Sequence, residues 1–533
     1  MANYAQHVGT RQTSQSQAVL GKNQVKNNAG GYVFEVSKWT QLNRFLVLGA
    51  AGGTYYQTEQ KLTVENANCV LACAAEDINK TLDIIVDMTI KAPKISPALF
   101  ALAILSGHEQ QAVRDAALGR LNDCCRTASH LFEFVSNVKH FRGWGRGLRN
   151  AVAGWYTSRN PNQLAYQCTK YQQRNGYSHR DLWRLSHPPT FEGTPIIQHV
   201  LGKPVEGQLP RLIEGVERAK SAKSANEIVS LIDEYGLVRE HIPNEWFSEV
   251  KVWDSLLQKM PLTAMIRNLG KMSSVGLLGP MSDANKLVIE RLNDQDYLTR
   301  AMVHPLTVLN ALVTYSHGKG LRGNLTWTAD NQIVSALDNA FHLAFGNIVP
   351  AGKKTLVGLD VSGSMTWGGV GDRVYRRSTP VGDPLTARQK GAAITMTFAR
   401  TEPEYHTMAF GNEFCSLPLT SNSTLNEALG MVHGLGMQRT DCALPMIYAK
   451  KNNIPVDTFV VITDNETWYG NIHPFQALKD YRNHTGRNAK LAVIAMSATK
   501  FSIADPSDPG MMDFVGFDLS GPQVLNDFSR GDL

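Results

Sequence analysis

One short stretch of this sequence combines oxygen-bearing side chains with a spacing that could bind a metal ion. Asp360, Ser362 and Ser364 occupy alternate positions directly after the apolar run 355–359, a pattern typical of a buried parallel strand. In open α/β sheets, ligands bind where such strands end, and carboxylate and hydroxyl oxygens suit a hard cation such as Mg²⁺. The alternative is a polar strand-to-helix turn in which a serine caps the following helix.

Two other loops carry oxygen donors that could join this stretch. The apolar run 458–462 leads into Asp464. The loop 434–441 places Thr440 and Asp441 just before a predicted helix. Because parallel strands end at one edge of their sheet, these side chains could meet. Each acid also has a purely structural explanation, since Asp441 can cap the helix and Asp464 can form a turn.

A second candidate site is a window in which cations greatly outnumber acids. Between residues 139 and 184 there are nine cations and a single acid, Asp181. Cations neutralise phosphates, and exposed aromatic rings can stack on unpaired bases. The cations are Lys139, Arg142, Arg146, Arg149, Arg159, Lys170, Arg174, Arg180 and Arg184, and the aromatic residues among them are Phe141, Trp144, Trp155, Tyr156, Tyr166, Tyr171, Tyr177 and Trp183.

The spacing within this window predicts two adjacent helices. Tyr166, Lys170 and Arg174 follow one another at intervals of four, so we expect them on one face of a helix. The pair Asn175-Gly176 would end that helix.

The second predicted helix begins with a capping pair. Ser178 can cap its first turn, and Asp181, three positions on, completes a box-like arrangement. Arg180, Arg184 and His187 would line one side of this helix. The two helices would then present one positive surface.

The plain alternative for this window is a solvated helical face above core aromatic residues. Ordinary surfaces mix both signs of charge, however, so the strong bias favours RNA or another polyanion. Irregular or single-stranded RNA fits better than duplex DNA, because the sequence has no recognition-helix motif, zinc finger or basic zipper.

The composition is that of an ordinary globular protein with more than one domain. Of its residues, 43% are hydrophobic and 19% are charged. With 533 residues, the chain is too long for a single hydrophobic core. The net charge of +6 is mild, so a nucleic-acid role must depend on where the charges lie. The seven cysteines do not have the spacing of a zinc site. The sequence also has no signal-peptide core and no apolar run near the ~18 residues of a membrane span. We therefore expect a cytoplasmic protein.

We predict three segments along the chain. Residues 1–30 form a polar leader, residues 31–346 a series of paired amphipathic helices, and residues 347–533 an alternation of strands and helices. The helices predict an α-solenoid of the HEAT-like kind, and the alternation predicts a doubly wound parallel sheet. The expected fold is thus two-part, an all-α helical-repeat region followed by an α/β, Rossmann-like domain.

Six stretches of the chain resemble a known family: 169–182, 184–188, 360–365, 440–446, 463–467 and 503–506. The first two are similar to a TROVE module. The next three resemble the metal-ion-dependent adhesion site (MIDAS) of a von Willebrand factor A-type domain. In this order, over nearly the whole chain, they resemble the Ro ribonucleoprotein (Ro/SS-A autoantigen) family, which has bacterial members.

The resemblance implies a metal site and an architecture. The cofactor would be Mg²⁺ or another divalent cation, and a vacant position in its octahedral shell could accept a carboxylate from a partner protein. The helical repeats would form a ring closed by the A-type domain. We see no nucleophile–base pair, so we expect no catalytic residue and no enzyme activity. The implied ligands are Asp360, Ser362, Ser364, Thr440 and Asp464.

The resemblance also implies two kinds of RNA ligand. Small non-coding Y RNA would bind the outer basic surface, and single-stranded 3′ ends of misfolded RNAs would enter a central hole. Matching motifs assign Lys170, Arg174, Arg180 and His187 to the RNA surface, and the other members follow from charge alone. The predicted set is Lys139, Arg142, Arg146, Arg149, Lys170, Arg174, Arg180, Arg184 and His187.

Two features depart from the family pattern. Trp367–Thr386 is a polar loop with three arginines, longer than expected after such a motif. Gln438-Arg439 precede Thr440 where small glycines are expected. Arg439 would repel a divalent ion unless its side chain turns away or pairs with an acid.

These observations favour a non-catalytic RNA-binding protein that acts in RNA quality control. The alternative is a Mg²⁺-dependent protein-binding adaptor for which RNA is incidental. A Mg²⁺-dependent nuclease is disfavoured, because one metal without a second ion or a His/Glu base has no evident way to activate water. Expected partners are Y RNA, RNA 3′ ends and an exoribonuclease or other RNA-processing protein, with no membrane, for a monomer in the cytoplasm.

Overall fold

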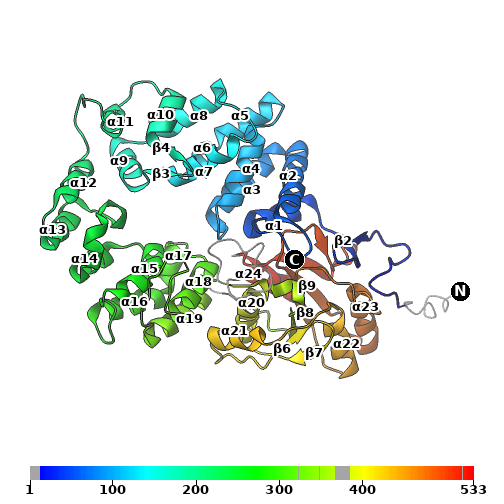
Figure 1. Cartoon of the computed structure of the whole chain (residues 1–533). Helices are drawn as coiled ribbons and strands as arrows, with labels where there is room; N and C mark the ends of the chain where they lie inside the picture. Colours follow the sequence, from blue (N-terminus) through cyan, green and yellow to red (C-terminus); the bar gives the residue numbers. More distant parts are fainter. Residues whose placement is uncertain (1–11, 322, 347, 367–384, 519, 533) are drawn as a thin grey trace. The chain divides into compact units, whose positions relative to one another are not determined.

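The computed structural model of the chain describes residues 12–321, 323–346, 348–366, 385–518 and 520–532. These residues fall into two compact units. An α/β unit contains the described chain up to Cys69, residues 304–313 and the chain from Phe341 onward, and a helical unit contains residues 70–303 and 314–340 (Figure 1). The expected fold class, a helical region followed by an α/β domain, is confirmed.

A six-stranded sheet forms the centre of the α/β unit. The strands are β5 (Thr355–Asp360), β6 (Tyr405–Phe410), β7 (Phe414–Ser416), β8 (Thr458–Thr463), β9 (Lys490–Ala495) and β11 (Met511–Val515). Their order is β11-β9-β8-β5-β6-β7, and all neighbours are parallel except β6 and β7. Helical crossovers between parallel strands give the predicted doubly wound arrangement.

Helices cover both faces of this sheet. They are α20 (Ala387–Thr401), α21 (Leu425–His433), α22 (Leu444–Lys451), α23 (Pro474–Thr485) and α24 (Gly521–Arg530), with the short 3₁₀ helix η3 (Gly363–Thr366) after β5. A Cβ atom on Gly358 of β5 would point at Pro445 of α22, whereas the next residue, Leu359, lies where a Cβ on Gly391 of α20 would point. Because successive strand residues face opposite ways, α20 and α22 lie on opposite sides.

Residues 12–36, here called the N-terminal arm, pack on this domain. Its two strands, β1 (Val25–Lys26) and β2 (Tyr32–Glu35), form a second small sheet with β10 (Phe501–Ser502), in which β2 pairs with both neighbours. Phe34 is buried and meets Phe475 of α23 edge to face, with 5.4 Å between the ring centroids. Much of the segment described as a polar leader from its composition is therefore part of the α/β unit. The predicted boundaries after residues 30 and 346 stay predictions.

Nearly all other regular structure in the described residues is helical. The helices are α1 (Lys38–Leu48), α2 (Glu59–Glu76), α3 (Ile78–Lys91), α4 (Ser96–Ser106), α5 (Gln111–Gly119), α6 (Leu121–Cys124), α7 (Ala128–Val138), α8 (Arg146–Thr157), α9 (Pro161–Lys170), α10 (His179–Ser186), α11 (Thr194–Leu201), α12 (Arg211–Ser221), α13 (Ala225–Tyr235), α14 (Val250–Lys259), α15 (Leu262–Ser274), α16 (Asp283–Asn293), α17 (Gln295–Arg300), α18 (Pro305–Ser316) and α19 (Asn331–Leu343), with 3₁₀ turns η1 (Arg239–His241) and η2 (Asn244–Ser248).

Neighbouring helices of the helical unit pack on one another along the chain. Helix α3 contacts α4, α12 contacts α13, and α13 contacts α14, which is typical of helical repeats. The closure of such repeats into a ring stays a prediction. None of the described helices is both long and apolar enough to cross a membrane.

The prediction of one helix through Tyr166, Lys170 and Arg174 was wrong. Helix α9 ends at Lys170, and Arg174 lies in a two-stranded hairpin, β3 (Gln173–Arg174) with β4 (Tyr177–Ser178). The two turn residues, Asn175 and Gly176, have φ values of 51° and 79°. An Asn-Gly pair with positive φ at both positions is the preferred two-residue hairpin turn, so the local turn chemistry overrode the helical spacing.

Candidate metal centre and basic surface

The predicted metal ligands of the first stretch lie together at the carboxyl end of β5. Asp360 is the last residue of that strand, and Ser362 and Ser364 follow in the turn that contains η3. The Ser362 amide donates to Asp360 Oδ1 at 2.9 Å, and the two serine hydroxyl oxygens lie 3.1 Å apart. All three side chains are buried, so their oxygens gather in one protected place.

Asp464 reaches the same place from the neighbouring strand. Strands β5 and β8 are parallel partners, and their carboxyl ends lie side by side. Thr463 joins the two ends, because its hydroxyl donates to Asp360 Oδ2 at 2.7 Å. The Ser364 side chain is hydrogen-bonded to Asp464. Four of the five predicted ligands are thus linked within one cluster.

Thr440, the fifth predicted ligand, comes from the loop before α22. Its side chain is 0% exposed, and within the described residues its hydroxyl has no hydrogen-bond partner. The amides of Trp468 and Tyr469 donate to the Thr440 carbonyl at 3.2 and 3.1 Å, which holds this loop against the one that carries Asp464. An unsatisfied buried polar group costs about 1–3 kcal/mol, so a cation would give this oxygen its missing partner.

The electrostatics of this cluster favour a cation. Burial, and next the charge of Asp464, raise the pKa of Asp360 to about 7. Burial also raises the pKa of Asp464. Burial and the charge of Asp464 raise the pKa of Glu466 to about 8. A positive ion among these carboxyl groups would stabilise their charged forms.

The donor atoms also indicate which kind of ion fits. In the part of the chain that the structure describes, no group of three or more His, Cys, Asp and Glu side chains is placed to hold a metal ion. A site here would therefore consist of two carboxylates and three hydroxyls. Such an all-oxygen set suits Mg²⁺, which keeps several of its waters, and does not suit Zn²⁺, which prefers nitrogen and sulfur.

Arg439, which would oppose a bound cation, is turned toward an aromatic ring. Its guanidinium carbon lies 4.5 Å from the centroid of the Tyr469 ring, and its side chain is exposed. The aromatic ring face and solvent therefore stabilise the positive charge of Arg439. The predicted polar loop Trp367–Thr386 lies outside the described residues except for its last two positions.

The role of Asp441 was left open by the sequence, and the structure gives it a structural one. Its Oδ1 accepts hydrogen bonds from the Ala443 amide at 3.0 Å and from the Gln15 side chain at 2.6 Å. Sequence reasoning missed both Gln15 and Thr463. Thr463 could have been found, because it directly precedes Asp464, whereas no local signal marks Gln15.

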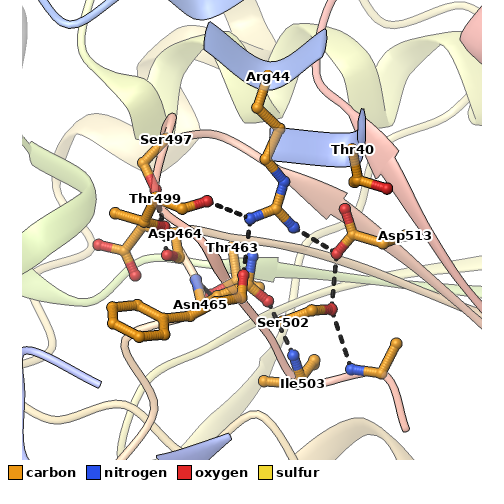
Figure 2. A network of polar contacts seen from close by, with 12 residues as sticks. Thr40, Arg44, Thr463, Asp464, Asn465, Ser497, Thr499, Ser502, Ile503 and Asp513 are labelled. Atoms are coloured by element: carbon orange, nitrogen blue, oxygen red, sulfur yellow. Dashed lines mark hydrogen bonds and ion pairs between the residues drawn. The ribbon is translucent and has the colours of Figure 1, made fainter. Parts of the chain in front are cut away.

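A second polar network supports the Asp464 loop from the side of α1 (Figure 2). Arg44, fully buried, donates to the Thr499 carbonyl at 2.7 Å and pairs with Asp513 at 2.5 Å. The Ser497 hydroxyl lies 3.0 Å from the Thr499 hydroxyl and donates to the Asp464 carbonyl at 3.2 Å. The backbone at Asp464 is thereby tied to a charged residue far away in the sequence.

In the helical unit, several predicted RNA-binding cations gather around the β3–β4 hairpin. Lys139 follows the last residue of α7, and its ammonium lies 5.9 Å from the centroid of the Tyr177 ring. Arg174 of the hairpin pairs with Glu133 of α7 at 3.6 Å. The hairpin therefore lies against α7 and brings two of the cations together.

Helix α10, directly after the hairpin, carries three more predicted residues. Its capping pair is confirmed, because the Ser178 amide donates to Asp181 at 2.8 Å and the Asp181 amide donates back to the Ser178 hydroxyl at 3.4 Å. Arg180, Arg184 and His187 are exposed. His187 caps the end of the helix in the left-handed conformation, with φ 47°.

Several cations of the window are engaged by uncharged groups. Arg142 donates to the Ser106 carbonyl at 2.8 Å. Lys170 donates to the Tyr166 hydroxyl at 2.8 Å. Arg159 lies over a buried tryptophan ring, 3.5 Å from its centroid. These contacts orient the side chains without cancelling their charge.

Almost none of the positive charge in the window is compensated by ion pairs among the described residues. Among the described residues, Arg174 is the only one of its nine cations that forms an ion pair with an acid. Arg146 and Arg149 are exposed near the start of α8. Because surfaces usually mix both signs of charge, this unbalanced set is suited to a polyanion.

The aromatic residues of the window divide into core and surface. Trp155 and Tyr156 are fully buried, so they cannot stack on bases. Tyr156 instead holds the junction before α10, since its hydroxyl lies 3.0 Å from Nδ1 of the buried His179. Phe141 is exposed and Tyr177 half-buried, and such side chains remain available at the surface.

The fold and these sites define a class of protein, in which a unit of helical repeats is joined to a von Willebrand factor A-type α/β domain. Residues 25–227 and 211–313 match the TROVE domain, and residues 354–529 match the Ro60 vWA domain. The chain belongs to the Ro60 family, as the resemblance of its motifs predicted.

Relatives support this assignment over almost the full length. The chain is 40% identical to the RNA-binding protein RO60 of Deinococcus radiodurans, over 96% of this chain and 97% of that protein. It is 35% identical to the RNA-binding protein RO60 of Caenorhabditis elegans, over 96% and 90%. The crystal structure of the Deinococcus radiodurans RO (RSR) protein matches 93% of this chain and all of that one, with 37% identity and a TM-score of 0.67. The family is non-catalytic, which agrees with the expectation that this chain is not an enzyme.

Proposed function

We propose that this chain is a non-catalytic RNA-binding protein that holds a small non-coding Y RNA and acts in RNA quality control. The Y RNA would lie on the basic surface, formed by Lys139, Arg142, Arg146, Arg149, Lys170, Arg174, Arg180, Arg184 and His187. The observation that carries this proposal is the charge of that surface. Among the described residues, only Arg174 of its cations forms an ion pair with an acid.

The arrangement of these cations suits a folded RNA. They come from the connection between α7 and α8, the start of α8, the end of α9, the hairpin and α10 with its C-cap, so a phosphate backbone can contact several elements at once. Phosphate contacts position an RNA without reading its sequence. Binding of this kind weakens steeply with salt, because each neutralised phosphate releases counterions.

A second RNA ligand, the single-stranded 3′ end of a misfolded RNA, is proposed from the family resemblance. It would enter the central hole of the predicted ring and leave the basic surface to the Y RNA. Competition tests this division. A tailed single-stranded RNA should bind in the presence of saturating Y RNA if the two sites are separate, and mutual exclusion would contradict it.

We also propose that the α/β unit binds Mg²⁺ or another divalent cation through Asp360, Ser362, Ser364, Thr440 and Asp464. The bound ion would supply an open coordination position for a carboxylate of a partner protein. The chain's own contribution is to bury all five side chains, and among the described residues the Thr440 hydroxyl has no hydrogen-bond partner.

The same metal site supports the alternative function, a Mg²⁺-dependent protein-binding adaptor. The partner proposed in either case is an exoribonuclease or other RNA-processing protein, met by a monomer in the cytoplasm. Purification of the protein from its native cells distinguishes the two proposed functions. Co-purifying RNA supports the first, and a protein partner that survives nuclease treatment and is lost with EDTA supports the second.

The direct test of RNA binding is a salt-dependent titration with Lys170, Arg174 and His187 changed to Ala. The probe is the RNA that co-purifies with the protein, transcribed in vitro. We expect weaker binding and a smaller dependence on salt. Lys451→Ala, an exposed cation of α22 in the α/β unit, is the control and should bind normally. Unchanged affinity in the triple variant, or binding indifferent to salt, would overturn the proposal.

A further inference from the structure

The N-terminal arm makes side-chain hydrogen bonds to both loops that carry the proposed ligands Thr440 and Asp464. Gln15 of the arm is 0% exposed. Its side-chain NH₂ donates to Asp441 Oδ1 at 2.6 Å, in the first loop. Its side-chain oxygen accepts from the Thr467 hydroxyl, in the second. One buried side chain from the start of the chain therefore bridges the two loops.

Two other residues of the arm hold Glu466, the acid two positions after Asp464. The Asn28 side chain donates to Glu466 Oε1 at 2.7 Å, and the Ala29 amide donates to Oε2 at 3.1 Å. Glu466 is 1% exposed. Both oxygens of a buried carboxylate beside the proposed metal site are thus engaged by the arm.

The arm is also locked onto the backbone of this second loop. Asn27 donates to the Thr467 carbonyl at 2.8 Å and to the Asn465 carbonyl at 3.3 Å, while its own oxygen accepts from the Gly31 amide at 2.8 Å. Gly31 lies so close that a Cβ atom there would be 1.9 Å from the Thr467 carbonyl oxygen. The contact between arm and loop is therefore specific to these residues.

We propose that Gln15 and Asn28 are positioning residues of the metal site. By engaging the carboxylates of Asp441 and Glu466, they keep these two acids from competing for the ion. By bridging the two loops, Gln15 also holds the proposed ligands Thr440 and Asp464 in place. This inference rests on the metal site proposed above and extends it, because it makes the N-terminal arm part of a site whose ligands all lie after residue 359.

Gln15 and Asn28 would affect metal binding because residues that hydrogen-bond around metal ligands fix the geometry of those ligands. Partners of this kind typically change metal affinity by about 10–100-fold when they are removed. Without the arm, Asp441 and Glu466 would lose donors that satisfy buried oxygens, and such oxygens must find another positive partner. They would then compete with the five proposed ligands for the ion, so the coordination would change.

The test is a titration of the full-length protein with Mn²⁺, followed by electron paramagnetic resonance of the free ion. Gln15→Ala and Asn28→Ala should each weaken Mn²⁺ binding by about tenfold or more. Lys22→Ala is the matched control, because Lys22 is on the same arm but pairs with Asp505. It should bind within about twofold of the wild type, because its hydrogen-bond partners Asp505 and Ser507 lie outside both ligand-bearing loops. Asn28 is only half-buried, so its variant remains informative if the Gln15 variant does not fold.

Hydrogen exchange of the metal-free protein gives a second, independent readout. The amides of Trp468 and Tyr469, which donate to the Thr440 carbonyl, should exchange faster in both arm variants and normally in Lys22→Ala. Wild-type Mn²⁺ affinity and unchanged exchange in both variants would overturn the positioning role. If the wild type and Asp464→Ala both fail to bind Mn²⁺, the metal proposal is wrong and any faster exchange shows only that the arm holds the loops.

Discussion

Replacing Tyr156 by phenylalanine tests how the β3–β4 hairpin and α10 are held in place. Nε2 of His179 lies 3.0 Å from the Tyr171 carbonyl and 3.3 Å from the Gln167 carbonyl. Carbonyls only accept, so Nε2 carries the hydrogen and Nδ1 accepts from the Tyr156 hydroxyl at 3.0 Å. Burial lowers the pKa of His179 to about 4, which keeps the ring neutral at pH 7.

The expected cost follows from the burial of both partners. Tyr156 is 0% and His179 is 2% exposed, so water cannot replace the lost hydroxyl. An unsatisfied buried acceptor costs about 1–3 kcal/mol. Tyr166→Phe is the control, because this hydroxyl is half-buried and accepts from Lys170. It should cost about 0.5 kcal/mol or less.

Urea unfolding of both variants, with hydrogen exchange at residues 171–179, measures these costs. The charges are unchanged in Tyr156→Phe, so the salt dependence of RNA binding should keep its slope even where affinity falls. The reasoning is refuted if Tyr156→Phe is no less stable than Tyr166→Phe, or if exchange at the hairpin is the same in both.

Two further predictions concern stability. Burial lowers the pKa of His179 and of His241 to about 4, below the ordinary value near 6.5, so the unfolded chain binds protons first as the pH falls. The stability that these neutral rings provide is present above about pH 6.5 and lost between about pH 6.5 and 4, by about 2 kcal/mol per histidine from pH 7 to pH 5. The raised pKa values of Asp360 and Glu466 act in the opposite direction, so urea unfolding at the two pH values compares the wild type with His179→Gln/His241→Gln. The wild type should lose more stability than this variant, and an equal change in both proteins would contradict the prediction. Gly31→Ala should destabilise the α/β unit by about 2 kcal/mol or more, because its Cβ would meet backbone atoms that cannot move aside. Thermal unfolding against Gly430→Ala, a helical glycine with open space around it, measures the difference, and equal melting temperatures would exclude a close contact at Gly31.

The meeting of Asp360 and Asp464 was predictable because both follow strong strand patterns, whereas metal binding there stays a prediction. Strands β5 and β8 are buried at every position, so their apolar runs stand out in the sequence. Once two parallel strands are recognised, their ends must lie near each other, and Asp360 and Asp464 come together without any knowledge of side-chain packing.

The hairpin at Arg174 was missed because two local signals compete there. The interval of four between Tyr166, Lys170 and Arg174 fits a helix, whereas Asn175-Gly176 fits both a helix end and a hairpin turn. The structure ends α9 at Lys170. The hairpin nevertheless lies near Lys139, whose ammonium is 5.9 Å from the Tyr177 ring centroid, and a single RNA surface stays a prediction.

The N-terminal arm could not be predicted from its composition. Gln15, Asn27 and Asn28 are polar residues of the kind that fill disordered leaders. Their partners are Asp441, Glu466 and the backbone near Thr467, more than 400 positions away. Hydrogen bonds of this range leave no periodic pattern in the sequence.

The central claim, that the basic surface binds phosphates, is tested most directly by the salt slope of RNA binding in Arg180→Ala/Arg184→Ala. The comparison is Lys451→Ala/Lys479→Ala, which removes the same charge from exposed positions of α22 and α23. If the two arginines each neutralise one phosphate, the slope of log K against log salt falls by about 1.4–1.8 in the first variant only. Equal slopes in the two double variants would contradict the account.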